Sequence, residues 1–277
     1  MKALRILRNS WLDVVALIVV GILYVVPFTF ILLTAAKPQA EAGLFQFTWP
    51  SQFHLFENIR EVLAFGDNRM YRAFWNSIVL TVGSVTLIVF LSAFVAFVMQ
   101  RRNDRIASVA NALVLSGLII PPALVPTIFL LQKLGIYKML LSLIFIETAF
   151  LIPFAILVFR AFMATIPREI DEAAIVDGAS PVQIFIRIIL PLLWPAIVTV
   201  IVLTSVIVYS DFTLPTYFLP GKENITVQVT LFGFMSQFGS QWNLMFAAVL
   251  IITIPPLILF IFFQRQIVSG LTSGAIR

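Results

Sequence analysis

Two carboxylates, Glu147 and Asp211, interrupt long hydrophobic stretches of this chain. Ionisable side chains are costly in an apolar environment, so each is a candidate functional residue by default. Tyr209 closely precedes Asp211, and Thr204 lies about two helical turns before it on a similar face. Hydroxyls, a carboxylate and an aromatic ring together suit a neutral polyol ligand. These four residues predict a substrate pathway; the alternative is that Asp211 reaches interfacial water or neutralises a base on another helix.

The sequence lacks the motifs for nucleotide hydrolysis, for a metal site and for a histidine-based triad. There is no GxxxxGK[ST] phosphate-binding loop, so the chain is not expected to hydrolyse nucleotide itself. It has no cysteine, and its one histidine, His54, has neither a cysteine nor paired acids near it in sequence. We therefore expect no catalytic residue, no metal site and no cofactor, and we interpret His54 as a solvated loop residue.

The composition indicates an integral membrane protein. The chain is 61% hydrophobic and only 11% charged, with a mean hydropathy of +1.04, whereas globular proteins carry about a quarter charged residues. The net charge of +5 would suggest nucleic acid in a soluble protein. Here the bases flank hydrophobic runs, so membrane lipid is the expected neighbour and no nucleic acid is expected.

Six hydrophobic runs are long enough to cross a bilayer, which takes about 20 helical residues. They lie near residues 13–35, 74–99, 107–131, 140–162, 191–215 and 243–263. Most of the arginines between the runs fall on one side, which predicts that this side and both termini are cytoplasmic. Prolines inside the third, fourth and sixth runs are expected to kink those helices and point to a translocation pathway; the alternative is that membrane helices simply carry more proline.

One long hydrophilic interval, residues 167–191, separates the fourth and fifth runs. Gly178 is expected to end a first helix there. Ser180 can cap a second helix, with Gln183 three residues later completing a capping box. The sequence therefore predicts an all-α polytopic protein with six transmembrane helices and a cytoplasmic helix-turn-helix loop.

The same interval carries a family resemblance. Glu172-Ala173-Ala174, then Gly178, then Ile188, Leu190 and Pro191 match the EAA loop of permease subunits from bacterial carbohydrate-uptake ABC importers. The chain resembles the maltose-type "G" branch of these permeases in particular, and weaker similarity runs through its whole length. It departs from that branch at residues 209–212, where Tyr-Ser-Asp-Phe stands in place of a Trp-Asn pair.

The resemblance implies a domain plan. Residues 1–12 and 266–277 are expected to be cytoplasmic ends, and residues 13–265 a six-helix domain that contains the coupling loop, 164–190. The protein is expected in the bacterial inner membrane. Its implied partners are a second permease subunit, two ATP-binding subunits on the cytoplasmic face, an extracytoplasmic solute-binding protein and a carbohydrate substrate.

The resemblance also assigns residues to coupling with the ATP-binding subunits. The implied set is Glu172, Ala173, Ala174, Asp177 and Gly178. Glu172 would pair with a basic group, the two alanines would allow close seating, and Gly178 would make the turn.

Three other functions stay open from the sequence. An importer for a polyol phosphate would need bases within the spans or at their outer ends. A membrane-embedded lipid-modifying enzyme would need clustered acids or histidines. A gated channel would leave the helix-turn-helix interval unexplained.

Overall fold

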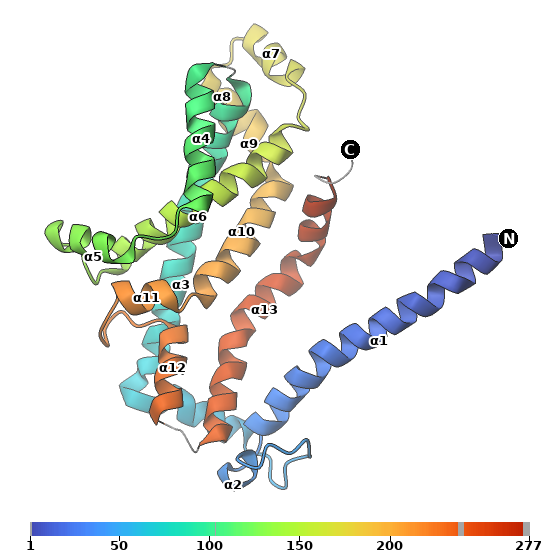
Figure 1. Cartoon of the computed structure of the whole chain (residues 1–277), viewed down its shortest axis with the longest axis vertical. Helices are drawn as coiled ribbons and strands as arrows, with labels where there is room; N and C mark the ends of the chain where they lie inside the picture. Colours follow the sequence, from blue (N-terminus) through green and yellow to red (C-terminus); the bar gives the residue numbers. More distant parts are fainter. Residues whose placement is uncertain (1, 103, 238–240, 274–277) are drawn as a thin grey trace. The chain divides into compact units, whose positions relative to one another are not determined.

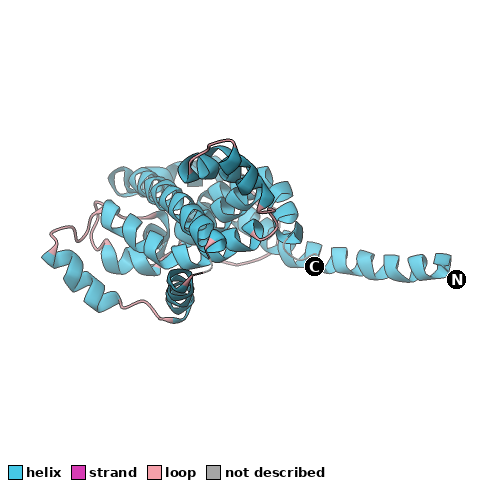
Figure 2. Cartoon of the chain, turned by 90° about the horizontal axis from the view of Figure 1, so that it is seen from above, coloured by secondary structure: helices cyan, strands magenta, loops and turns pink. Residues whose placement is uncertain are grey.

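A computed structural model of the chain describes residues 2–102, 104–237 and 241–273. Every regular element in these ranges is a helix, joined by loops (Figure 2), so the predicted all-α class is confirmed. The helices are α1 Lys2–Ala35, α2 Gln39–Ala42, α3 Leu55–Arg101, α4 Arg105–Ile119, α5 Leu124–Lys133, α6 Leu140–Met163, α7 Glu169–Val176, α8 Pro181–Ile184, the π-helix η1 Phe185–Ile189, α9 Leu190–Leu192, α10 Trp194–Ser210, α11 Thr213–Phe218, α12 Val227–Gln237 and α13 Trp242–Ser273.

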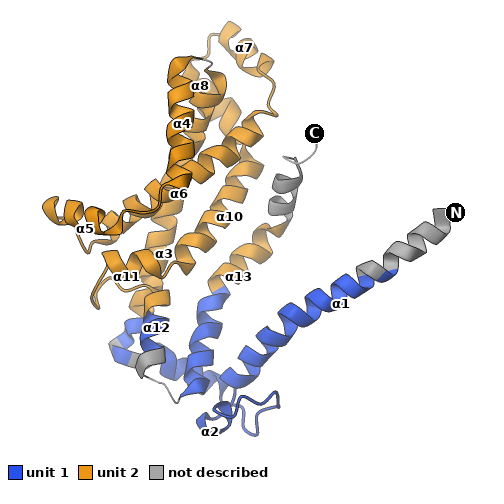
Figure 3. Cartoon of the chain, viewed as in Figure 1, with its two compact units in different colours: residues 1–70, 230–254 blue, residues 71–229, 255–277 orange. Residues whose placement is uncertain are grey.

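The chain divides into two compact units (Figure 3). Unit 1 holds residues 1–70 and 230–254, and unit 2 holds residues 71–229 and 255–277. The long helices α3 and α13 each contribute to both units. Each unit is described here by itself.

Four helices are long and apolar enough to cross a membrane, at Val14–Ala35, Asn68–Arg101, Leu140–Met163 and Trp242–Gln264. Two bent pairs, Arg105–Ile119 with Leu124–Lys133 and Pro181–Leu192 with Trp194–Ser210, bring the number to 6 if each pair is one span. The predicted count of six therefore stays a prediction, since it depends on how these pairs meet the bilayer.

The proline-rich third run is broken where the sequence predicted a kink. The axes of α4 and α5 differ by 110° across the intervening residues. Pro121 and Pro122 lie in the break, where neither has an N–H to continue the helical ladder, and Ile120 before them is extended with ψ 121°. Pro153 in α6 and the pair Pro255 and Pro256 in α13, by contrast, lie inside continuous helices.

The predicted terminal segments belong to the first and last helices, α1 and α13. The N-terminal segment 1–12 belongs to α1 from Lys2 onward, and the tail 266–277 continues α13 as far as Ser273. Residues 1 and 274–277 of those two predictions lie outside the described part of the chain. The helix that contains the second run also begins early, at Leu55, because helical structure extends through the polar residues before the run.

The core of unit 2 depends on close approaches of helices at small residues. α6 packs against both α4 and α10 there (Figure 1). A Cβ atom at Gly117 of α4 would lie 2.8 Å from Cγ of Pro153, and one at Gly83 of α3 would lie 2.8 Å from Cδ1 of Ile144. Because glycine has no Cβ atom, the helix backbones can approach closely at these two positions, as is common where membrane helices pack.

The two glycines are expected to tolerate a methyl group differently. Gly117→Ala should destabilise the protein, because the rigid proline ring cannot move aside and overpacking typically costs about 1–3 kcal/mol. Gly83→Ala should be close to neutral, since the Ile144 side chain can rotate and alanine gains about 1 kcal/mol in a helix. Thermal unfolding midpoints of the purified variants in detergent test this; an equal shift in both would contradict it.

Candidate functional site

The hydrophilic interval folds as a helical hairpin, which we call the finger (residues 167–191). Its first helix, α7, ends in a Schellman motif: Gly178 N donates to Ile175 O at 2.9 Å, and Ala179 N donates to Ala174 O at 2.9 Å. Gly178 has a φ of 81°, a conformation that L side chains rarely adopt. Gly178 therefore ends α7 and makes the turn, as the sequence predicted.

The second helix of the finger begins with the predicted capping box. Ser180 Oγ accepts from Gln183 N at 3.4 Å, and Gln183 Oε1 accepts from Ser180 N at 2.8 Å. The helix then passes through the π-helical turn η1 and bends by 74° at Leu193 before α10. Local hydrogen bonds thus define both sides of the turn in the finger.

The residues assigned to coupling divide between two faces of the finger. Glu172, Ala173, Asp177 and Gly178 are exposed, whereas Ala174 is only 7% exposed and packs into the core of unit 2. The sequence analysis missed the side chains that stand out most, Ile175 at 61% and Val176 at 87% exposure. The available signal was a pair of adjacent branched apolar residues directly before the Asp177-Gly178 turn.

The predicted pathway residues only partly come together. Glu147 and Asp211 line one pocket of about 530 Å³ in unit 2, with Pro122, Leu124, Phe150, Leu151, Ile207, Ser210, Thr213 and Leu214. The Glu147 side chain is 2% exposed and hydrogen-bonds with Asp211, while its Oε1 has no partner among the described residues. The two carboxyl groups therefore form a hydrogen-bonded pair in a pocket lined largely by apolar residues.

Thr204 and Tyr209 do not line this pocket. Thr204 is fully buried, and its hydroxyl donates to the carbonyl of Val200 at 2.7 Å, one turn earlier in α10. Tyr209 is 6% exposed, and its hydroxyl has no partner among the described residues. Helical spacing alone did not reveal that these side chains turn into the protein.

Asp211 also has a structural role. Its Oδ1 accepts from Thr213 N at 2.8 Å and its Oδ2 accepts from Leu214 N at 3.1 Å. These are N–H groups of the first turn of α11, which lack partners within their own helix. Asp211 thus caps α11 and contacts Glu147 at the same time.

Side chains of α3 hold the loop after α11. Asn76 Nδ2 donates to Glu223 O at 3.1 Å and to Ile225 O at 3.0 Å. Ser77 Oγ accepts from Val227 N at 3.0 Å. These bonds restrain the loop on either side of its exposed turn, residues 220–223.

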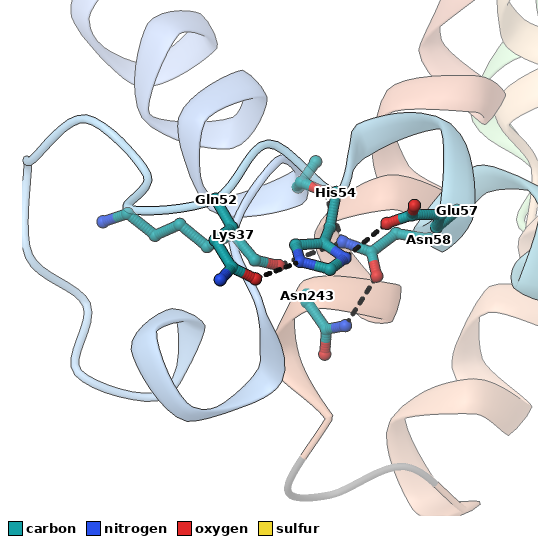
Figure 4. A network of polar contacts seen from close by, with 7 residues as sticks. Lys37, Gln52, His54, Glu57, Asn58 and Asn243 are labelled. Atoms are coloured by element: carbon teal, nitrogen blue, oxygen red, sulfur yellow. Dashed lines mark hydrogen bonds and ion pairs between the residues drawn. The ribbon is translucent and has the colours of Figure 1, made fainter.

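His54 belongs to a network of polar contacts in unit 1 (Figure 4). Its Nδ1 contacts the Glu57 carboxylate, and its Nε2 lies 3.1 Å from Gln52 Oε1. Asn58 donates to the carbonyls of Ala35 and Lys37, and Asn243 donates to Asn58 Oδ1 at 2.8 Å. The network therefore fastens the loop after α1 to α13. Among the described residues no group of three His, Cys, Asp or Glu could hold a metal ion.

A family model described as "Binding-protein-dependent transport system inner membrane component" matches residues 88–273. The chain belongs to this family. It is a multi-pass permease subunit of an ABC importer in the bacterial inner membrane, and ATP hydrolysis takes place in separate subunits.

Individual relatives agree with this assignment. The chain is 28% identical over 280 residues to the melibiose/raffinose/stachyose import permease protein MelC of Bacillus subtilis, covering 99% of this chain and 100% of MelC. It is 30% identical over 259 residues to the inner membrane ABC transporter permease protein YcjP of Escherichia coli, covering 91% and 90%.

A solved structure has the same fold. The chain matches a bacterial ABC transporter involved in the import of the acidic polysaccharide alginate, with a TM-score of 0.78 and 19% identity over 95% of this chain and 96% of that one.

Proposed function

We propose that the finger is the surface through which ATP-binding subunits drive this permease. The observation that carries the proposal is the exposure of Ile175 and Val176, 61% and 87%, on α7, the half of the finger that lies outside the candidate spans. Exposed apolar side chains clustered within a polar rim are typical of protein interfaces. The rim here includes the exposed acids Glu172 and Asp177. The matching surface would be a cleft with an apolar floor and basic edges.

The remaining assigned residues would shape the finger. Ala173 is exposed beside Glu172 and leaves room for a close approach, whereas Ala174 faces the core of the permease. Gly178 sets the direction in which the second helix leaves the turn. Contact would therefore rest on Glu172, Ala173, Ile175, Val176 and Asp177.

The mechanism that follows is alternating access. Closure of the ATP-binding subunits on ATP would move this finger and that of the second permease subunit together, and the membrane helices would rock around a central pathway. This mechanism requires that the finger lies on the cytoplasmic side of the membrane, and we propose the same side for residues 1–12 and 266–277. The arginines that flank the spans support that orientation. Labelling of a single cysteine at exposed Ala164 by an impermeant thiol reagent added outside intact cells would contradict it.

The proposed substrate is a neutral oligosaccharide. MelC is named for melibiose, raffinose and stachyose, which are uncharged. The Glu147–Asp211 pocket offers acceptors, exposed hydroxyl groups from Ser210 and Thr213, and the apolar face of Phe150. A negative charge on this carboxyl pair would repel an anionic sugar or a polyol phosphate, and this favours an uncharged ligand.

Gly178→Val should uncouple transport from ATP hydrolysis. A Cβ at Gly178 would meet nothing within 4 Å, so the cost is the strain of the backbone, roughly 1–2 kcal/mol. We expect uptake in proteoliposomes of the full importer to fall at least tenfold while ATP hydrolysis continues.

Two controls isolate the position and the conformation. Gly178→Asn should keep at least half of the uptake, because asparagine tolerates the left-handed conformation. Gly135 has a φ of 71° and the same empty surroundings outside the finger, so Gly135→Val should strain the chain without uncoupling it. Normal uptake by Gly178→Val would refute the coupling role.

The substrate class is testable on the binding protein that operates with this permease. Its thermal midpoint should rise with melibiose, raffinose or stachyose and stay unchanged with an alginate oligosaccharide or glycerol 3-phosphate. A shift with only the anionic compounds would replace the neutral sugar by an anionic substrate.

Asp211→Asn should lower uptake of that sugar about tenfold while leaving the amount of assembled importer unchanged. Asparagine keeps an acceptor for the first turn of α11 but removes the charge next to Glu147. Asp211→Ala, which removes the acceptor as well, should also lower assembly. Unchanged uptake kinetics in Asp211→Asn would leave Asp211 as a helix cap alone.

A further inference from the structure

The first helix of the finger is attached to the end of α3 by two polar contacts. Arg101, the last residue of α3, forms an ion pair with Asp171 in the first turn of α7, with Nε 2.5 Å from Oδ2. Arg168, at the N-terminal boundary of α7, donates from Nη2 to the carbonyl of Gln100 at 3.1 Å. Both contacts join segments about 70 positions apart in sequence, and both lie in unit 2.

The two charges suit the helix ends that they meet. The carbonyls of the last turn of α3 lack partners within their own helix, and Arg168 satisfies that of Gln100. A cation is favourable at the C-terminus of a helix and an anion at the N-terminus, which places Arg168 and Asp171 correctly for the dipoles of α3 and α7. The attachment therefore has a defined geometry and is more than an attraction between two surface charges.

Burial distinguishes the Arg101–Asp171 pair from its neighbour. The side chains of Arg101 and Asp171 are 16% and 13% exposed, whereas those of the adjacent pair Arg102 and Asp104 are 50% and 41% exposed. An exposed pair contributes little, but removing one partner of a largely buried pair leaves an uncompensated charge. The first pair is thus suited to hold a position, and the second provides a matched control.

The second helix of the finger packs on the same part of α3. The centroid of the Phe185 ring lies 5.4 Å from the ring centroids of both Phe94 and Phe97. Phe185 also belongs to a buried cluster that includes Ala174 and Ile184. Both halves of the finger therefore contact α3, one through charges and one through aromatic rings. Figure 1 shows α7 and α8 together at one end of unit 2.

We propose that Arg101 and Asp171 are positioning residues that join the finger to α3, so that movement of the finger enters α3 directly as well as along the chain into α10. This inference rests on the proposed coupling function of the finger. The covalent connections of the finger lead only to α6 and α10. The ion pair adds a route to a third helix that lies far away in sequence.

The test is the number of ATP molecules hydrolysed per sugar imported by the full importer in proteoliposomes, with the sugar that shifts the thermal midpoint of its binding protein. Arg101→Gln and Asp171→Asn should each raise this ratio at least threefold. The double variant should be no worse than either single one, because the residues act through one interaction. Arg101→Lys, which keeps the charge, should stay within about twofold of the wild type, and the control Arg102→Gln should leave the ratio unchanged.

A distance measurement separates positioning from general weakening. The chain has no cysteine, so nitroxides can be attached at introduced cysteines replacing exposed Val82 on α3 and exposed Glu169 on α7. Their separation is on the order of 30 Å from the rise of α3. We expect one narrow distance distribution in the wild-type importer, both without nucleotide and with ATP and vanadate. In Asp171→Asn the distribution should be at least twice as broad.

The outcomes distinguish this inference from the function on which it rests. A wild-type ratio in Arg101→Gln and Asp171→Asn, with Gly178→Val still uncoupled, would overturn the attachment and leave the coupling role of the finger intact. A wild-type ratio in all three would overturn both. Loss of assembly in Asp171→Asn, which keeps the shape of the side chain, would make the pair a folding element and would also overturn the inference.

Discussion

The structure depends on one constraint, which is that backbone N–H and C=O groups have no water to bind inside a bilayer. Helices satisfy those groups internally, and all regular elements in the described ranges are helical. Where a helix stops near the membrane, side chains take over. Asp211 accepts from two N–H groups of α11, and Asn76 donates to two carbonyls of the following loop. Much of the polar chemistry in this chain therefore supports the backbone.

This constraint explains why polar residues in or next to the hydrophobic runs have different roles. Thr204 satisfies a carbonyl of its own helix and is withdrawn from any ligand. Glu147 retains a carboxylate oxygen without a partner among the described residues, beside a pocket. Asp211 both caps a helix and contacts Glu147, so the polar lining of the pocket and the first turn of α11 depend on one side chain.

The finger has a different arrangement, because its first helix, α7, lies outside the candidate spans and polar groups cap both sides of its turn. A Schellman motif and a capping box define its turn, and its inner face joins the core through Ala174, Ile184 and Phe185. Its outer face presents apolar side chains that the fold leaves uncovered. The coupling role proposed for the finger would need a rigid body and a surface for the partner; local hydrogen bonds would supply the first, and Ile175 and Val176 the second.

The sequence by itself determined the features that arise from local chemistry. Hydropathy indicated membrane helices, Gly178 and Ser180 predicted the turn and the cap, and the EAA pattern indicated the family, because each depends on residues close together in the chain. Tertiary structure decided the rest. The sequence predicted a kink in the third run at its prolines, but not the 110° angle between α4 and α5. The pairing of Arg101 with Asp171, and the inward turn of Ala174 and Thr204, depend on which helices become neighbours in space, and spacing along one chain cannot specify that.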